Sequence, residues 1–593
     1  MVLQKVWAAL AQGWQWLACR LANLRRRWLR SRLPDYTVIV LNQPLTERPP
    51  ARPWWYAFLP GMAPPLSLAD LSDALWRIAA DPDVKGALIL VKAPPLAVTQ
   101  AQSLAMLFDR FRMWDRQFHG EATPRKRVVI HLEHITRALY VAACAADQVV
   151  VTPLTSWDVV GLYTAPTFWK QTLARAGVQM DVVKVAPWKT AFDRFSEAEM
   201  SPAYAEQTQW LYDSLYANLL ESISRGRNLP AETVATLINE APWTAEEALA
   251  ANLVDAIAYE DELPALLGAG AKPARLKPYR ETRGLLFRRT PQRTAQAVGV
   301  ISLTGAIMPG QSRSFPIPLP LFGDEVLGHL TAQQQIRAAR ADRRLAAVVV
   351  YVDSPGGSAL ASDLIWRELQ LLNDEKPVVV YMGAIAGSGG YYIALPSRAI
   401  VAQPATLTGS IGVITAKPVL QEAYAKLQAN RYAIQRGKNA DLFREDRCWD
   451  ERQRAKIEAS VRHNYDQFKQ RVAGGRNLPL DGLDAICSGK VWTGAQALAH
   501  GLVDALGDFH VAVERAAQLA NLPGDLQARV IDLTPPKRRL LAEPAQVLKQ
   551  TLGLRPTESW AELTRLLVAG EWQTLLQHEH HWWLTIDQPP ELF

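Results

Sequence analysis

An internal duplication constrains this chain more than any other feature. Two blocks occur twice, in the same order and 249 residues apart. They are SRGRNLPAETVATLI at 224 with AGGRNLPLDGLDAI at 473, and APWTAEEALAANLVDAI at 241 with KVWTGAQALAHGLVDAL at 490. Further upstream, ADPDVKGALILVKAPP at 80 matches ADRRLAAVVVYVDSPG at 341. This pattern predicts a duplicated domain of roughly 230 residues.

Within each half, short runs rich in Val, Ile and Leu alternate with amphipathic stretches. The first half has ALILV, RVVIHL and QVVVT, and the second has AVVVYV, PVVVYM and AIVAQ in the same order. Near-continuous apolar strands interleaved with helices are typical of parallel sheets covered by helices on both faces. We therefore expect an α/β fold of the βαβ type, present twice.

The repeats divide the chain into five segments. The duplicated domains are expected over 35–265 and 297–523. A basic segment punctuated by Gly and Pro, 266–296, is expected to be the linker between them. An N-terminal arm occupies 1–34, and a tail for which the sequence suggests no role occupies 524–593.

The N-terminal arm carries the whole excess charge of the chain. It holds seven Lys and Arg residues and no acid, and the net charge of the chain is +7. The body is therefore balanced, which argues against a nucleic-acid partner. Apolar residues recur in the arm at spacings of three and four, the pattern of one helix face. They are Trp7, Leu10, Trp14, Leu17, Leu21, Leu24 and Trp28.

We expect this arm to lie on a membrane surface. Its charge-free run, 6–19, has 14 residues, whereas a spanning helix needs about 20. A Trp-bearing stripe with Arg behind it suits an interfacial helix on anionic lipid. The alternatives are a helix that docks on the protein itself or on a second copy, and, less favoured, a secretory signal.

Nothing in the sequence calls for a metal or another cofactor. The four cysteines, Cys19, Cys144, Cys448 and Cys487, are widely spaced without a CxxC pair, so neither disulfides nor a zinc ribbon is expected. The histidines of HLEH, His131 and His134, and the tail histidines, His578, His580 and His581, form no ligand pattern. Neither a GxxxxGK[ST] loop nor an HExxH motif is present.

Comparing the halves distinguishes residues that both copies keep, which we expect to form the fold, from residues that only one copy keeps, which are candidates for an active site. The second half has SPGG at 354–357 and GSGG at 387–390, whereas the first half has APPL at 93–96 and Arg137 opposite Ser388. Both glycine-rich features are thus present in one half and absent from the other. A serine nucleophile needs donors for an oxyanion. The amides of Gly356, Gly357 and Gly389 are the candidates.

The serine also needs a base, and Lys189 is the candidate. It lies in VAPWKTAF, an apolar neighbourhood that would depress the pKa of an amine, and Ala440 occupies the aligned position in the second half. The serine is thus kept in one half and the lysine in the other. A composite Ser–Lys site that spans the two halves explains both losses.

Five motifs together resemble one family. YVDSPGGS, GAIAGSGGYYIA, TLTGSIGV, VAPWKTAF and VWTGAQALAHGLVDALG are similar to the signal peptide peptidase A family, also called protease IV, in its long duplicated form. The match covers about residues 36–523. The resemblance implies tandem Clp-protease/crotonase-like domains, and a Ser–Lys serine endopeptidase that cleaves short apolar peptides such as released signal peptides.

Carried onto this chain, the resemblance makes Ser388 the nucleophile and Lys189 the general base, with Ser410 of TGSIG orienting the lysine. It also implies a homo-oligomer, a tetramer, at the bacterial inner membrane. The short arm departs from the transmembrane helix usual in the family, so the cytoplasmic and periplasmic faces both stay open.

Two other functions stay open from the sequence. A crotonase-type enzyme acting on acyl-CoA also uses paired backbone amides, and a non-catalytic membrane scaffold would keep the fold alone. Pro-rich apolar segments follow the first strand of each half and are expected to line the rim of an assembly or to pack between subunits. Their apolar residues are Trp54, Trp55, Tyr56, Phe58, Phe315, Leu319, Leu321 and Phe322.

Overall fold

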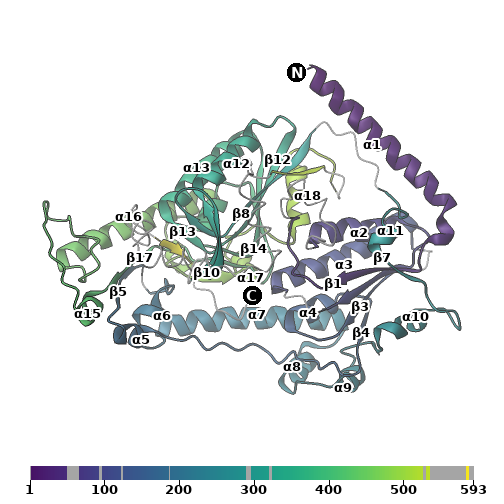
Figure 1. Cartoon of the computed structure of the whole chain (residues 1–593), viewed down its shortest axis with the longest axis horizontal. Helices are drawn as coiled ribbons and strands as arrows, with labels where there is room; N and C mark the ends of the chain where they lie inside the picture. Colours follow the sequence, from purple (N-terminus) through teal and green to yellow (C-terminus); the bar gives the residue numbers. More distant parts are fainter. Residues whose placement is uncertain are drawn as a thin grey trace.

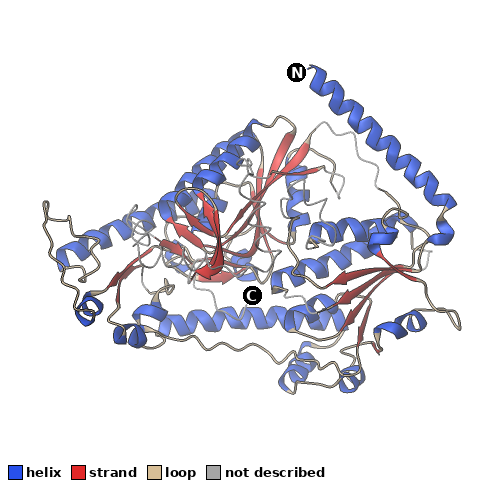
Figure 2. Ribbon diagram, in the orientation of Figure 1, coloured by secondary structure: helices blue, strands red, loops and turns tan. Residues whose placement is uncertain are grey.

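The two halves of the chain are each built around a sheet with helices on its faces. The computed structural model describes residues 2–49, 66–92, 96–121, 125–185, 187–288, 296–319, 323–524, 529–533 and 583–585. Figure 1 shows the two halves side by side, and Figure 2 shows strands in each half flanked by helices. The predicted α/β class is confirmed.

The first half contains a six-stranded sheet in the order β6-β4-β3-β2-β1-β7, in which every neighbouring pair is parallel. All residues of β2 are buried, as expected for a strand covered on both faces. The strands are β1 (Tyr36–Leu41), β2 (Gly86–Val91), β3 (Arg127–Leu132), β4 (Gln148–Val151), β6 (Ala256–Ile257) and β7 (Leu276–Pro278).

The main sheet of the second half repeats this topology. Its strands β19-β15-β14-β12-β8-β20 are all parallel and follow the order of the first sheet. Two short strands, β16 and β18, extend the carboxyl end of β14. The strands are β8 (Ala297–Thr304), β12 (Leu345–Ser354), β14 (Val378–Gly387), β15 (Ala399–Ala402), β16 (Leu407–Gly409), β18 (Val491–Thr493), β19 (Ala505–Leu506) and β20 (Val530–Asp532).

A third, mixed sheet combines strands from distant parts of the chain in the order β10-β11-β9-β13-β21-β17-β5. Strand β5 belongs to the first repeat and pairs antiparallel with all six residues of β17. The first repeat therefore extends into the second half. The strands are β5 (Gln179–Lys184), β9 (Ala306–Met308), β10 (Arg313–Leu319), β11 (Gly323–Gly328), β13 (Gly356–Ser358), β17 (Ile414–Val419) and β21 (Trp583–Thr585).

The helices also occur as equivalents. The 26-residue helices α7 (Pro202–Arg227) and α16 (Glu451–Arg476) start 249 residues apart, and an asparagine in the left-handed conformation caps each C-terminus. The other helices are α1 (Val2–Trp28), α2 (Leu68–Ala80), α3 (Val98–His119), α4 (Arg137–Ala143), α5 (Lys170–Arg175), α6 (Asp193–Ser196), α8 (Ala231–Asn239), α9 (Ala245–Ala250), α10 (Leu263–Leu266), α11 (Tyr279–Thr282), α12 (His329–Ala341), α13 (Ala359–Glu375), α14 (Gly389–Ala394), α15 (Gln421–Lys426), α17 (Gly494–Ala499) and α18 (Phe509–Leu519).

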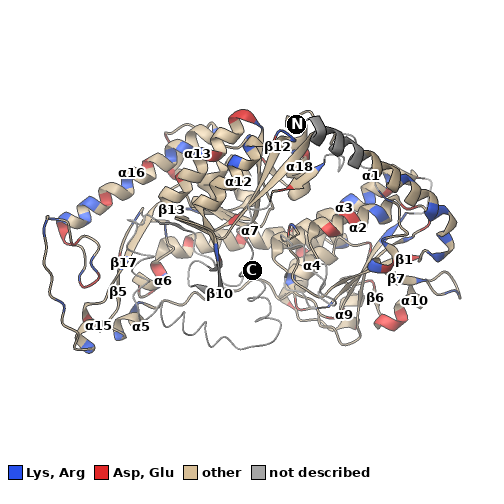
Figure 3. Ribbon diagram, turned by 45° about the horizontal axis from the view of Figure 1, so that its top comes forward, with Lys and Arg blue, Asp and Glu red and all other residues tan. Residues whose placement is uncertain are grey.

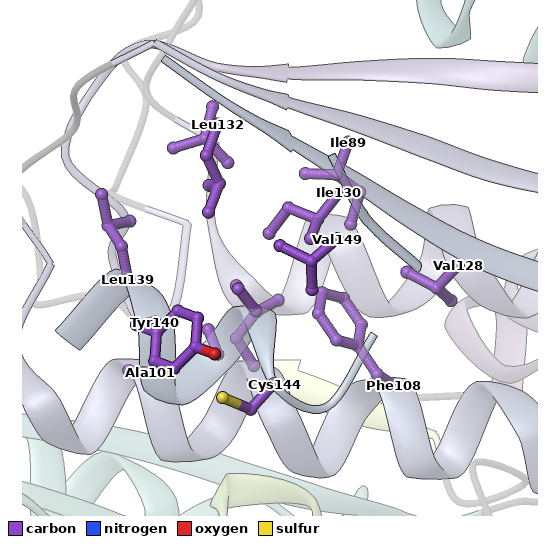
Figure 4. Packing of buried hydrophobic residues seen from close by; sticks show 14 of the residues in the cluster. Ile89, Ala101, Phe108, Val128, Ile130, Leu132, Leu139, Tyr140, Cys144 and Val149 are labelled. Carbon is purple, nitrogen blue, oxygen red and sulfur yellow. The ribbon is translucent and has the colours of Figure 1, made fainter. Parts of the chain in front are cut away.

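Each half has its own apolar core. In the first, strand residues such as Ile130 and Val149 pack over Phe108 of α3 and Tyr140 of α4 (Figure 4). The buried Tyr140 hydroxyl donates to the Leu253 carbonyl at 2.6 Å. Tyr391 makes the same bond to the Leu502 carbonyl at 2.8 Å in the second half. The equivalence of these tyrosines, 251 residues apart, supports the alignment of Arg137 with Ser388.

Both sheets end on a strand that lies outside the expected repeat boundaries. Strand β7 falls within the segment 266–296 expected to be a linker, and pairs with β1. Strand β20 falls within the tail 524–593 and pairs with β8. Both segments thus supply a sheet edge, a role that their composition did not suggest.

The arm residues 2–28 form a single helix, α1, on the outside of the first half (Figure 1). Asn23 exchanges two hydrogen bonds with the Arg288 backbone, at 2.9 and 2.8 Å, and the buried Arg26 forms an ion pair with Asp81. The basic residues gather toward the C-terminal end of α1 (Figure 3). None of the described helices is both long enough and apolar enough to span a membrane.

Several residues singled out from the sequence lie outside the described part of the structure. They are Trp54, Trp55, Tyr56, Phe58, Leu321, Phe322, His578, His580 and His581. The predictions made for them stay predictions.

Candidate active site

Ser388 lies in a sharp turn between a strand and a helix. It directly follows β14 and precedes α14, and its backbone adopts φ 52° and ψ −109°, which is rare for a residue with a side chain. Its amide donates to the Gly409 carbonyl at 2.7 Å. The side chain is fully buried. The turn thus presents the hydroxyl at the carboxyl end of a central strand.

The glycines after Ser388 allow this turn to pack tightly. A Cβ at Gly389 would lie 2.6 Å from the Ser362 hydroxyl, and one at Gly390 would lie 2.6 Å from the Ser354 carbonyl. Because atoms this close cannot coexist, α14 could not sit against the start of α13 and the end of β12 if it carried side chains there.

Lys189 reaches this serine from the other repeat. It lies between β5 and α6, and its Nζ is 2.7 Å from the Ser388 Oγ. The same Nζ is 2.8 Å from the Ser410 carbonyl oxygen and 2.9 Å from the Ser410 Oγ. The structure therefore brings together three of the residues selected from the sequence, across 199 and 221 positions of chain.

Lys189 is almost completely buried, which is rare for a lysine. Its side chain is 1% exposed, and desolvation, with no carboxylate to offset it, lowers its pKa well below the ordinary value of 10.5. A neutral amine has two N–H donors and one lone pair. The two Ser410 oxygens can accept the N–H groups, which leaves the lone pair to accept a hydrogen bond from the Ser388 hydroxyl.

Ser410 is held in its own constrained turn just after β16. It is buried, with a φ of 51°, and its amide donates to the Lys490 carbonyl at 2.6 Å. Its carbonyl and hydroxyl oxygens both face the lysine amine. This placement agrees with the orienting role that the family resemblance implies.

The glycines selected as oxyanion donors lie beside the serine, but they are not equivalent. A Cβ built on Gly389 would lie 3.2 Å from both the Gly357 nitrogen and the Gly356 Cα, so the two loops touch. The Gly356 amide, however, donates to the Ser354 hydroxyl at 3.2 Å. Since that bond occupies the Gly356 amide, Gly357 and Gly389 are the better candidates for the oxyanion.

Gly489 contributes to the site and was not selected from the sequence. It has a φ of +90°, and a Cβ there would lie 2.5 Å from the Lys189 backbone nitrogen. By the offset of 249, its partner in the first half is Glu240. The same reciprocal comparison that selected Ser388 could therefore have selected Gly489.

Helix α7 holds the lysine loop against the second half. The buried Gln207 donates to the Thr190 hydroxyl at 3.2 Å and accepts from the Val491 amide at 2.9 Å. Trp210 packs between Trp188 and Trp492, with ring centroids 5.0 and 5.1 Å away. No sequence motif marks these contacts, because their partners come from different repeats.

The equivalent position in the first half has no such chemistry. Arg137 occupies the place of Ser388 and donates to the Gly161 carbonyl at 2.9 Å. His131 is buried and bonded to the Ala258 carbonyl at 3.1 Å. Across the described residues, no cluster of His, Cys, Asp and Glu side chains has the arrangement of a metal site.

Comparison with known proteins agrees with this geometry. The model of peptidase family S49 matches the chain twice, over 121–272 and 370–523. The chain belongs to peptidase family S49. The first match contains Lys189, and the second contains Ser388 and Ser410. The protein is therefore a duplicated serine-type peptidase of the S49 family with a Clp-protease-like fold.

Named relatives cover most of the chain. A chloroplastic serine protease SPPA of Arabidopsis thaliana is 30% identical over 80% of this chain and 69% of its own. Protease 4 of Salmonella typhi is 31% identical over 77% of this chain and 72% of its own. A putative signal peptide peptidase SppA of Enterococcus faecium is 31% identical over 32% of this chain and 55% of its own.

Proposed function

We propose that this S49 peptidase is an endopeptidase in which Ser388 is the nucleophile and Lys189 the general base. The observation that carries the proposal is the 2.7 Å contact between Lys189 Nζ and Ser388 Oγ, both of which belong to buried residues. An amine whose pKa is lowered by burial, within hydrogen-bonding distance of a hydroxyl, is what general-base catalysis requires.

In the proposed mechanism, the neutral Lys189 amine takes the proton of the Ser388 hydroxyl while Oγ bonds to the scissile carbonyl carbon. The carbonyl π electrons move to oxygen, and the Gly357 and Gly389 amides stabilise the resulting oxyanion. Gly389 opens α14, and the first amides of a helix have no intrahelical acceptor.

The second half of the reaction uses the same lysine as an acid and then again as a base. The Lys189 ammonium protonates the leaving amine as the C–N bond breaks, which leaves an acyl ester on Ser388. Water then loses a proton to Lys189 and attacks the ester carbon. As the C–O bond to Ser388 breaks, the Lys189 ammonium returns that proton to Oγ, which restores the serine hydroxyl and the neutral amine. Ser410 acts as a positioning residue, since its two oxygens orient the amine throughout.

The proposed substrates are short apolar peptides such as released signal peptides. The family resemblance and the name of the Enterococcus faecium relative support this substrate class. As part of the same proposal, the protein is a homo-oligomer, a tetramer, and acts at the bacterial inner membrane.

The exposed face of α1 supports contact with a membrane surface. Trp14, Leu17, Leu21, Leu24 and Trp28 are 43–84% exposed. At 100° per residue they lie on the side of the helix opposite Asn23 and Arg26, which dock on the body. Arginines beside such a stripe favour anionic lipid.

The decisive experiment compares two buried lysines. Lys189→Met should lower cleavage of a fluorogenic Leu/Ala-rich peptide by about a thousandfold or more, as should Ser388→Ala. Lys417 is also buried, but it donates to the Arg444 and Arg447 carbonyls away from the serine, so Lys417→Met should keep most activity.

Labelling by a fluorophosphonate probe provides a second readout. The parent and Lys417→Met should be labelled at Ser388, and Ser388→Ala should not. Full peptidase activity in Lys189→Met would contradict the proposal that Lys189 is the general base. An unlabelled parent that turns over an acyl-CoA would favour the crotonase-type alternative, and a parent inert in every assay would favour the scaffold.

A further inference from the structure

The C-terminal tail of this chain contributes a strand directly beside the candidate active site. Strand β21 lies between β13 and β17 in the third sheet and is antiparallel to both. Its register pairs Gly356 with Thr585, Gly357 with Leu584, and Ser358 with Trp583. The tail backbone therefore pairs with the two glycines of the SPGG loop.

The other neighbour of β21 also belongs to the site. Strand β17 begins at Ile414, four residues after Ser410, and Ile414 pairs with Trp583. Its other edge is occupied by β5, which leads into the Lys189 loop. The slot that β21 fills is thus bounded by the oxyanion loop on one side and by the strand next to the lysine on the other.

Without β21, this sheet would be interrupted. In the described part of the structure, β13 pairs otherwise only with β9, and β17 only with β5. Two facing strand edges with unpaired backbone groups are a receptor for an extended peptide. A peptide bound there would pass the Ser388 hydroxyl, since Gly357 touches the Gly389 turn.

We propose that residues 583–585 occupy the substrate cleft of their own chain and compete with peptide substrates. This inference rests on the proposed function, because it takes the slot beside Ser388 as the place where substrates bind. A tethered segment has an effective concentration of about millimolar. A tail that is docked nine-tenths of the time would weaken apparent substrate affinity by about tenfold.

Two truncations test this competition. Deleting 583–593 removes the strand, whereas deleting 586–593 removes the end of the chain and keeps the strand. The first should lower KM by about tenfold with kcat nearly unchanged, and the second should behave like the parent. Equal KM values in all three proteins would overturn the proposal.

A binding measurement separates this inference from the catalytic proposal. In a Ser388→Ala background, a fluorescein-labelled peptide of residues 580–588 should bind the 583–593 deletion at least about tenfold more tightly than the full chain. This readout needs no turnover, so it holds even if Ser388 is not the nucleophile. Equal affinity for the two proteins would exclude occupation of the slot by the tail.

The intact mass of the purified protein shows whether the tail strand stays bound without being cleaved or is itself cut as a substrate. The purified parent should retain its whole tail, as should Ser388→Ala. Loss of tail residues from the parent but not from Ser388→Ala would overturn the proposal that the tail remains bound and competes with substrates, because the segment would then be cleaved and released.

Discussion

At the scale of single residues, the candidate site depends on one contact between the two repeats, that of the Lys189 amine with the Ser388 hydroxyl. Ser388 and Lys189 were predicted because each is missing from the other half, and the structure places their side chains 2.7 Å apart. The Gly356 amide is one of three oxyanion candidates from the sequence, and in the structure it donates to the Ser354 hydroxyl. A sequence shows that a loop can offer amides, whereas only coordinates show which amides are already used.

The depressed pKa of Lys189 predicts the pH dependence of activity. The base is active when neutral, so kcat/KM should rise with pH through a single ionisation well below 10.5. Ser410→Ala removes one acceptor that stabilises the ammonium form, and should move this ionisation to lower pH while reducing the rate about tenfold or more. The measurement is kcat/KM against pH for both proteins.

A parent profile that rises only through an ionisation near the ordinary lysine value of 10.5 would contradict a neutralised lysine as the base. Ser397→Ala offers a matched control, since among the described residues the Ser397 hydroxyl donates to the Ala394 carbonyl in the same repeat. Its profile should coincide with that of the parent.

We expect Gly489 to be required both for its backbone angle and because a side chain there would collide with a neighbouring residue. Gly489→Ala and Gly437→Ala replace glycines of φ +90° and +93°, so each incurs about 1–2 kcal/mol of backbone strain. At Gly489 the new Cβ would collide with the Lys189 backbone. At Gly437 no heavy atom of the described residues lies within 4 Å of the added Cβ. Gly489→Ala should therefore lose more stability and most activity, as measured by urea unfolding and peptide cleavage. Similar losses in both variants would contradict this view.

At the scale of elements, strand and helix identities followed from composition, but partners across the repeats did not. The apolar runs predicted the parallel sheets, since a strand buried on both faces has a near-continuous apolar sequence. Nothing local in β5 or α7 indicates that they pack on the second half, because their contacts are with residues more than two hundred positions away. Strand β21 is three residues long and escaped prediction for the same reason.

Helix α1 should bind anionic vesicles through its outward stripe. Leu17→Gln with Leu21→Gln removes two exposed apolar side chains and should reduce co-sedimentation with phosphatidylglycerol vesicles several-fold. Leu427→Gln with Tyr432→Gln, also exposed but far along the chain, should leave it unchanged. If the two double variants behave alike, the stripe is not the membrane contact and docking on a second copy gains support.

At the scale of the whole molecule, the two repeats share one fold but contribute different residues to the candidate site. Each half keeps a complete parallel sheet and its own core, yet the candidate site needs the lysine of one and the serine of the other. The repeats predicted this composite site. They could not predict how the halves are fixed to each other, which depends on polar contacts between α3 and the second half, such as Gln102 with the Ala405 amide at 3.1 Å.

The buried ion pair between Arg110 and Asp508 is predicted to be a main element of this junction. Two nitrogens of Arg110 lie 2.9 Å from the two Asp508 oxygens, and both residues are buried. Arg110→Ala would leave a buried carboxylate without its partner, which costs about 3–5 kcal/mol. Arg344→Ala removes an exposed pair with Asp342 and should cost less than about 1 kcal/mol. Urea unfolding followed by Trp fluorescence measures both.

Activity then reports whether the junction holds the site together. Because Lys189 and Ser388 come from different halves, loosening the α3 contact should reduce peptide cleavage in Arg110→Ala at temperatures where both sheets remain folded by far-UV circular dichroism. Arg344→Ala should cleave like the parent under the same conditions. A fully active Arg110→Ala protein that unfolds at lower urea would show that α7 and β5 alone keep the lysine beside the serine.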